Sequence, residues 1–82
     1  MKKKTVKPTL FVATVTYYMK EATGYVGYWT KIETTYSRKG METWKRNEEL
    51  DSNEWVGVKE WRIHDRMYTR EEVEELKAKF ED

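Results

Sequence analysis

The sequence predicts an α+β fold, a small antiparallel sheet of about four strands packed by one C-terminal helix. Three observations predict it: two long segments rich in β-branched and aromatic residues, turn residues between the strand-like segments, and a helix-capping signal near the end. A chain of 82 residues corresponds to a single domain, residues 1–82. We expect the sheet over 9–64, with a partial barrel as an alternative, and the helix over 69–81.

A long N-terminal hairpin is the clearest strand pattern. Side chains alternate between the two faces of a strand, and the more apolar face of the first strand is expected to point at the core: Phe11, Ala13, Val15, Tyr17 and Met19. The opposite face holds Leu10, Val12, Thr14, Thr16 and Tyr18. A turn at 21–24, in which Gly24 can adopt a positive φ, leads into a second strand over 25–37.

The segment 41–50 is ambiguous. It follows a turn at 38–40, and its alternation favours a short edge strand protected by charge. The alternative is a helical turn carrying Trp44 and Leu50. A final strand over 55–64 places Trp55, Trp61 and Ile63 on one face, with Val56 and Val58 on the other. Gly57 within it indicates a bulge or a close backbone approach.

The C-terminal segment reads as a capped amphipathic helix. Thr69 and Glu72 have the spacing of a capping box, in which each side chain bonds the backbone amide of the other residue. Tyr68 and Val73 are placed as a hydrophobic staple. The stripe Val73, Leu76 and Phe80 can pack on one sheet face, which leaves the other face open.

Composition excludes several classes of function. The chain has no Cys, one His and no phosphate-binding glycine loop, so we expect no enzyme, no cofactor and no metal. Sixteen basic against fifteen acidic residues argue against a protein that coats nucleic acid by charge alone. Residues 1–8 are basic and expected to be flexible. The apolar run behind them is too short for a membrane span, so we expect a cytoplasmic protein with no membrane partner.

Twelve aromatic residues, four of them Trp, point to binding. An open sheet face with aromatic and basic side chains would suit a macromolecular partner, because Tyr, Trp and Arg carry much of the binding energy at protein interfaces. The predicted binding residues are Tyr18, Tyr25, Trp29, Lys31, Arg38 and Lys39. Another protein is the expected partner. Single-stranded nucleic acid is the alternative, and a homodimer through the sheet face is a further one.

The Lys-rich start, the strand-rich body and the ending from Tyr68 to Leu76 (YTREEVEEL) resemble many small uncharacterised proteins of bacteriophages and mobile elements. The ending also resembles helices of designed proteins. The phage resemblance implies an accessory protein that binds a host protein, often as an inhibitor. It identifies no site residues.

Overall fold

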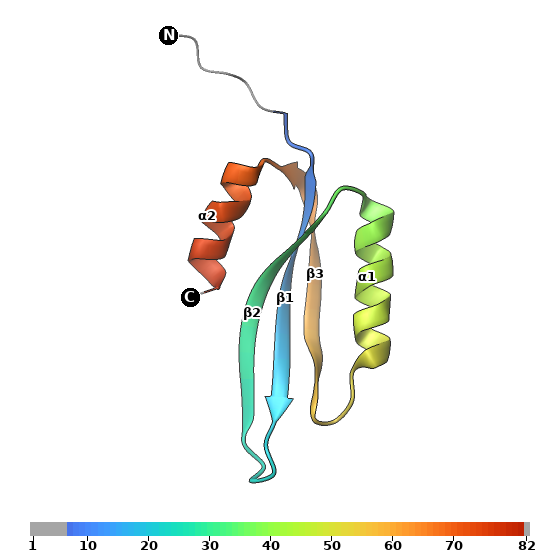
Figure 1. Ribbon diagram of the computed structural model, residues 1–82, viewed down its shortest axis with the longest axis vertical. Coiled ribbons are helices and arrows are strands. Elements are labelled where there is room, and N and C mark those ends of the chain that lie inside the picture. Colours follow the sequence, from blue (N-terminus) through green and yellow to red (C-terminus); the bar gives the residue numbers. More distant parts are fainter. Residues whose placement is uncertain (1–6, 82) are drawn as a thin grey trace.

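The computed structural model describes residues 7–81, which form an α+β fold of one three-stranded antiparallel sheet and two helices (Figure 1). The elements are β1 (Leu10–Lys20), β2 (Val26–Thr35), α1 (Arg38–Asp51), β3 (Val56–Tyr68) and α2 (Arg70–Phe80). The strand order is β2-β1-β3. The expected fourth strand is a helix, and the sheet is open, so the partial-barrel alternative is wrong as well. The predicted flexible segment 1–8 falls largely outside the described residues.

The N-terminal hairpin is confirmed. β1 and β2 pair without any register shift, from Phe11 opposite Thr35 to Lys20 opposite Val26. Gly24 adopts a φ of 93°, which glycine reaches without steric cost. The turn is closed by the Glu21 amide, which donates to the Tyr25 carbonyl at 2.8 Å.

Helix α1 replaces the edge strand expected over 41–50. Ser37 caps it, because its hydroxyl accepts from the Gly40 amide at 3.0 Å. Met41 is fully buried and Trp44 half-buried, three residues apart on one helix face. Leu50 lies on the opposite side of the helix, 74% exposed. The segment therefore adopts the helical alternative, but only Trp44 of the two expected residues contacts the sheet.

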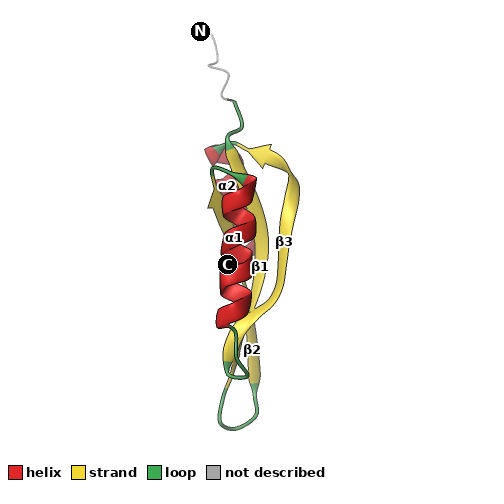
Figure 2. Ribbon diagram, turned by 90° about the vertical axis from the view of Figure 1, so that its right-hand side faces the viewer, coloured by secondary structure: helices red, strands yellow, loops and turns green. Residues whose placement is uncertain are grey.

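The two helices cover opposite faces of the sheet (Figures 1 and 2). On the α2 face, the buried cluster is Leu10, Val12, Ile32 and Val73. On the α1 face, it is Ala13, Val15, Met41 and Trp61. The expected apolar face of β1 is therefore buried at Ala13 and Val15, but Leu10 and Val12 on the supposedly open face are buried as well. Each face has its own core, because each is covered by one helix.

Strand β3 pairs with β1 through two register shifts, one between Phe11 and Ala13 and one between Thr16 and Tyr17. A bulge adds one residue to a strand and changes which face the following side chains occupy. The second shift places Val58 in the same cluster as Trp61 and Ile63. The prediction that Val58 faces away from Trp61 is therefore wrong. Trp55 lies outside the strand, which starts at Val56.

Gly57 confirms the expected close backbone approach. A Cβ at this position would stand 2.5 Å from Ser52 Cβ and 2.7 Å from Tyr18 Oη. Both distances are shorter than any normal contact, so a side chain here would displace the loop that joins α1 to β3.

Replacing Gly57 with alanine is therefore expected to lower the free energy of unfolding by about 1–3 kcal/mol through overpacking. Gly27→Ala is the matched control, because a Cβ there would meet its nearest atom at an ordinary 3.6 Å. Urea unfolding of both variants checks this. Equal midpoints for the two alanine variants would contradict the close approach at Gly57.

Helix α2 begins as the sequence predicts. The Glu72 amide donates to Thr69 Oγ1 at 3.2 Å, and the Thr69 amide donates to Glu72 Oε1 at 3.0 Å, which completes the capping box. Tyr68 packs against the cluster that contains Val73, as expected of the staple. Of the predicted stripe, Val73 is buried, Leu76 is half-buried and Phe80 is 39% exposed.

Neither helix is long enough to cover the sheet. At 1.5 Å per residue α1 spans about 21 Å and α2 about 16 Å, whereas the 13 residues of β3 span roughly 40 Å at 3.3 Å each. Figure 1 shows that the lower end of the sheet, next to the turn between β1 and β2, extends beyond both helices. We call the stretch from Tyr17 to Trp29, together with the start of β3, the distal half; it begins at Tyr17, which still packs against the cluster under α1.

Candidate functional site

Large apolar side chains are exposed on the α1 face of the distal half. Met19 pairs with Gly27 on one side and with Val56 on the other, so these positions share a face. The Tyr25 ring lies on that face too, 3.6 Å from where a Gly27 Cβ would stand. Trp29 lies two residues further along β2. We call Met19, Tyr25, Trp29 and Val56 the distal patch, and their exposed fractions run from 37% to 65%.

The side chain of Trp29 is held in place by Tyr17 on the neighbouring strand. Its indole stacks on the Tyr17 ring, with centroids 5.5 Å apart and planes inclined by 18°. The Tyr17 hydroxyl donates to Glu33 at 3.5 Å. Burial, together with the nearby Glu33 and Glu48 carboxylates, raises the pKa of Tyr17 to about 12. The hydroxyl therefore remains a neutral donor at physiological pH, and the support under Trp29 is constant.

The structure brings together three of the six residues predicted to bind. Tyr25, just before β2, and Trp29 and Lys31 within it all lie on the α1 face. Arg38 and Lys39 lie in the first turn of α1 at the opposite end of the sheet, about 20 Å from Trp29 at 3.3 Å per strand residue. Arg38 pairs there with Glu42 at 3.4 Å.

Tyr18 lies on the other face of the sheet. The register places Trp29 opposite Tyr17, so the expectation that Trp29 and Tyr18 share one surface is wrong. The Tyr18 hydroxyl donates to the carbonyl of Asn53 and thereby ties β1 to the loop before β3. We therefore assign Tyr18 a structural contact rather than a place in the distal patch.

Sequence reasoning missed Met19 and Val56. The sequence predicts the correct face for Met19, but it predicts that this whole face is core. Helix α1 covers only part of the face, and Met19 is exposed. Val56 was assigned to the wrong side because the alternation was continued through a bulge. The position of Met19 beside the turn was the available signal, since side chains at a hairpin end extend past a packed helix.

The α2 face of the distal half carries a different chemistry. Tyr28 is 56% exposed, and Lys59 Nζ lies 4.4 Å from its ring centroid, within the range of a cation–π contact. Lys20 Nζ lies 5.8 Å from the Trp55 ring. This surface therefore combines aromatic rings with cations, and the distal patch does not.

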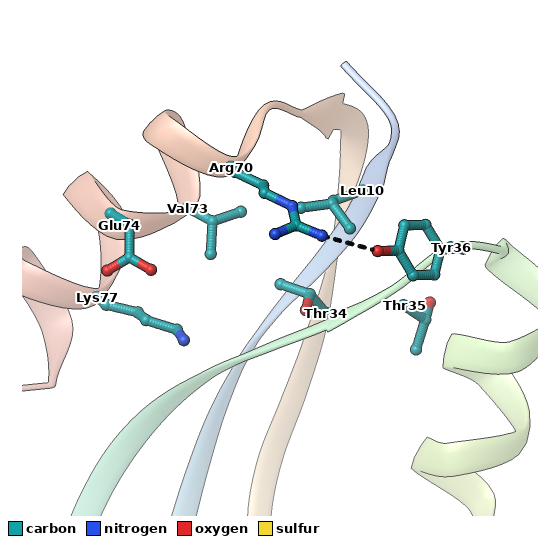
Figure 3. A pocket seen from close by; sticks show the side chains of 8 residues that line it. All are labelled: Leu10, Thr34, Thr35, Tyr36, Arg70, Val73, Glu74 and Lys77. Atoms are coloured by element: carbon teal, nitrogen blue, oxygen red, sulfur yellow. Dashed lines mark hydrogen bonds between the residues drawn. The ribbon is translucent and has the colours of Figure 1, made fainter. Parts of the chain in front are cut away.

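A shallow cavity of about 260 Å³ lies between α2 and the end of β2 (Figure 3). It is lined by Leu10, Thr34, Thr35, Tyr36, Arg70, Val73, Glu74 and Lys77. The Arg70 guanidinium donates to the Tyr36 hydroxyl at 3.3 Å. Because the Glu74 carboxylate lines the cavity together with the two cations Arg70 and Lys77, the cavity shows no single charge preference and indicates no particular ligand.

His64 takes part in a hydrogen-bonded chain. Its Nε2 lies 2.7 Å from Thr14 Oγ1, and its Nδ1 lies 2.7 Å from the Tyr68 hydroxyl. Burial lowers its pKa, and the charges of Arg62 and Arg66 lower it further. Both ring nitrogens of His64 thus have a hydrogen-bond partner, Thr14 and Tyr68.

Among residues 7–81, no group of three or more His, Asp or Glu side chains is placed to hold a metal ion.

Comparison of the chain with protein-family models, with curated proteins and with solved structures finds no match. Within the described part of the chain, neither helix has the length and apolar character needed to cross a membrane. The site must therefore be interpreted from its own geometry.

Proposed function

We propose that this protein is a non-enzymatic binding module that docks onto another protein through the distal patch. The observation that carries the proposal is the exposure of Met19, Tyr25, Trp29 and Val56 on one face, contributed by the hairpin and by β3. Contiguous exposed apolar patches on small proteins generally mark interaction sites. A small domain gains stability from every apolar side chain it buries, so leaving four exposed has a cost that binding would offset.

The chemistry of the patch favours a protein partner. Trp, Tyr and Met are enriched at protein interfaces, and an exposed Trp is a common hot spot. The Trp29 indole is already ordered by Tyr17, so little side-chain entropy is lost on binding. On the sequence resemblance alone, we propose a bacterial host protein as the partner, with inhibition as the consequence.

Trp29→Ala is expected to weaken the partner complex by about 2 kcal/mol or more, roughly 30-fold in Kd, because a preordered hot-spot ring is removed. The fold should persist, since Trp29 is outside both buried clusters. The matched control is Trp55→Ala, which removes an exposed Trp that lies outside the patch. Proteins retained from a bacterial lysate by wild type and both variants are compared by mass spectrometry, and calorimetry then gives Kd for the purified partner.

Two results would contradict this assignment. If Trp29→Ala retains the partner as well as the wild-type protein, the patch is not the site. If circular dichroism shows that Trp29→Ala unfolds the domain, Trp29 belongs to the core and the patch has been assigned wrongly.

Single-stranded nucleic acid is the second candidate, and the contact between Lys59 and Tyr28 favours it. Sheets that bind single strands use exposed rings for base stacking and cations for phosphates. On this reading the α2 face would bind, with affinity falling steeply as salt rises. Titration of oligonucleotides at two ionic strengths, followed by Trp fluorescence, tests it. Absence of quenching at low salt removes this candidate.

A further inference from the structure

The two edges of the sheet are protected unequally. At the start of β3, the outward backbone groups already have partners: the Val56 carbonyl accepts from the Asn53 amide at 2.9 Å, and the Val58 amide donates to Ser52 Oγ at 2.9 Å. Two bulges interrupt the rest of the strand, and charged residues are frequent along it. Bulges, charges and covering loops are the usual means by which proteins prevent pairing at a sheet edge.

Among residues 7–81, one contact closes the free edge of β2. The outward amide of Ile32 donates to the Glu81 carboxylate at the end of α2, at 2.6 Å. In an antiparallel pair every second residue points its backbone groups away from the partner strand. The Ile32 contact shows that the backbone groups of the even-numbered residues of β2 point outward. The bond between Glu21 and Tyr25 agrees, because the carbonyl of the odd-numbered Tyr25 points toward β1.

The outward residues Val26, Tyr28 and Thr30 therefore present their backbone groups along an open edge. Within residues 7–81 no side chain donates to or accepts from these backbone groups, and α2 meets this edge at Ile32, the next outward residue beyond Thr30. The stretch from Tyr25 to Thr30 contains no charge and no proline, and its register has no bulge. An uncharged, regular, aromatic edge strand is a template for another strand.

We propose that a second copy of this chain pairs with this edge, antiparallel, around a two-fold axis at Tyr28. In this register Tyr28 faces Tyr28 of the second copy, and Val26 faces its Thr30. About six hydrogen bonds would form, because each hydrogen-bonded pair exchanges two. The result is a continuous six-stranded sheet with isologous symmetry.

Two features of the strand suit this register. Trp29 falls opposite Gly27 of the second copy, so its indole meets no directly opposed side chain and lies beside the Tyr25 ring next to that glycine. Lys31 falls opposite Tyr25 of the second copy, so no like charges meet across the interface. Glu81 ends the pairing by occupying the Ile32 amide. Because the axis is perpendicular to the sheet, both distal patches lie on the same face of the dimer.

Light scattering coupled to size exclusion, run from micromolar to near-millimolar protein, tests the proposal. The wild-type mass should approach twice the 10.0 kDa of one chain as concentration rises. Tyr28→Lys and Tyr28→Glu should each reduce it to that of one chain, because like charges would meet at the axis. An equimolar mixture of the two variants should restore the dimer, since opposite charges then face each other.

Leu50→Lys is the control, because Leu50 is exposed on the far side of α1, and it should leave the dimer unchanged. Hydrogen exchange on the wild-type protein gives an answer that needs no variant: the Tyr28 and Thr30 amides should gain protection as concentration rises. A wild-type monomer at every concentration overturns the proposal. A dimer that survives Tyr28→Lys, or a mixture that stays monomeric, overturns this interface and register.

Discussion

Replacing Trp61 with alanine is expected to lower the free energy of unfolding by about 3–5 kcal/mol. Trp61 is 5% exposed and lies at the centre of the cluster under α1. Its ring meets Trp44 edge-on, with centroids 5.5 Å apart, so the substitution removes an aromatic pair as well as buried area. A domain of this size has a total stability of roughly 4–12 kcal/mol, so the expected loss is a large share of it.

Two further variants separate packing from other causes. Trp55→Ala removes a Trp that is 49% exposed and should cost about 1 kcal/mol or less. Trp61→Phe should cost clearly less than Trp61→Ala, because within residues 7–81 the buried indole Nε1 has no hydrogen-bond partner to lose. Urea unfolding followed by circular dichroism measures all three. Equal losses for Trp55→Ala and Trp61→Ala would show that the α1 cluster is not the core.

Met41→Ala is expected to lower the free energy of unfolding by about 2–5 kcal/mol. Met41 is fully buried between α1 and the sheet, and alanine would leave a cavity there. Alanine is a better helix former than methionine, so the loss would come from packing and not from the helix itself. The prediction thus tests whether α1 is docked on the sheet.

Leu50→Ala is the control within the same helix, because Leu50 is 74% exposed and should change stability by no more than about 0.5 kcal/mol. Denaturant midpoints decide the comparison. If Met41→Ala is as stable as Leu50→Ala, α1 is not packed on the sheet, and an edge strand over 41–50 again becomes the better interpretation.

Local signals in the sequence were sufficient for the hairpin and for α2. The turn around Gly24 and the capping box of Thr69 and Glu72 are formed by residues close in sequence, whose preferences do not depend on the rest of the fold. Both elements were predicted within two residues of their bounds. Helix α1 was not, because its charged residues suit an edge strand as well as a solvated helix. The Ser37 cap and the spacing of Met41 and Trp44 are the sequence signals that favour the helix.

The candidate site was predicted only in part. Tyr25, Trp29 and Lys31 were chosen from the hairpin pattern and do share a face. Arg38 and Lys39 were included because they are near in sequence, but a strand carries the chain away by about 3.3 Å per residue, which places them at the other end of the sheet. Tyr18 was included because the pairing partner of Trp29 was not known.

The sequence by itself determined the local elements: where the chain turns, where α2 begins, and which side chains alternate along β1 and β2. Tertiary structure alone decided which side chains are exposed. Exposure depends on how far each helix reaches along the sheet, and helices advance less than half as far per residue as strands. The face of the sheet on which Val56 and Trp29 lie was decided by the bulge near Gly57 and by the register between Tyr17 and Trp29. A shift of one residue moves a side chain to the other face. These are properties of contacts between distant segments, so no local pattern encodes them.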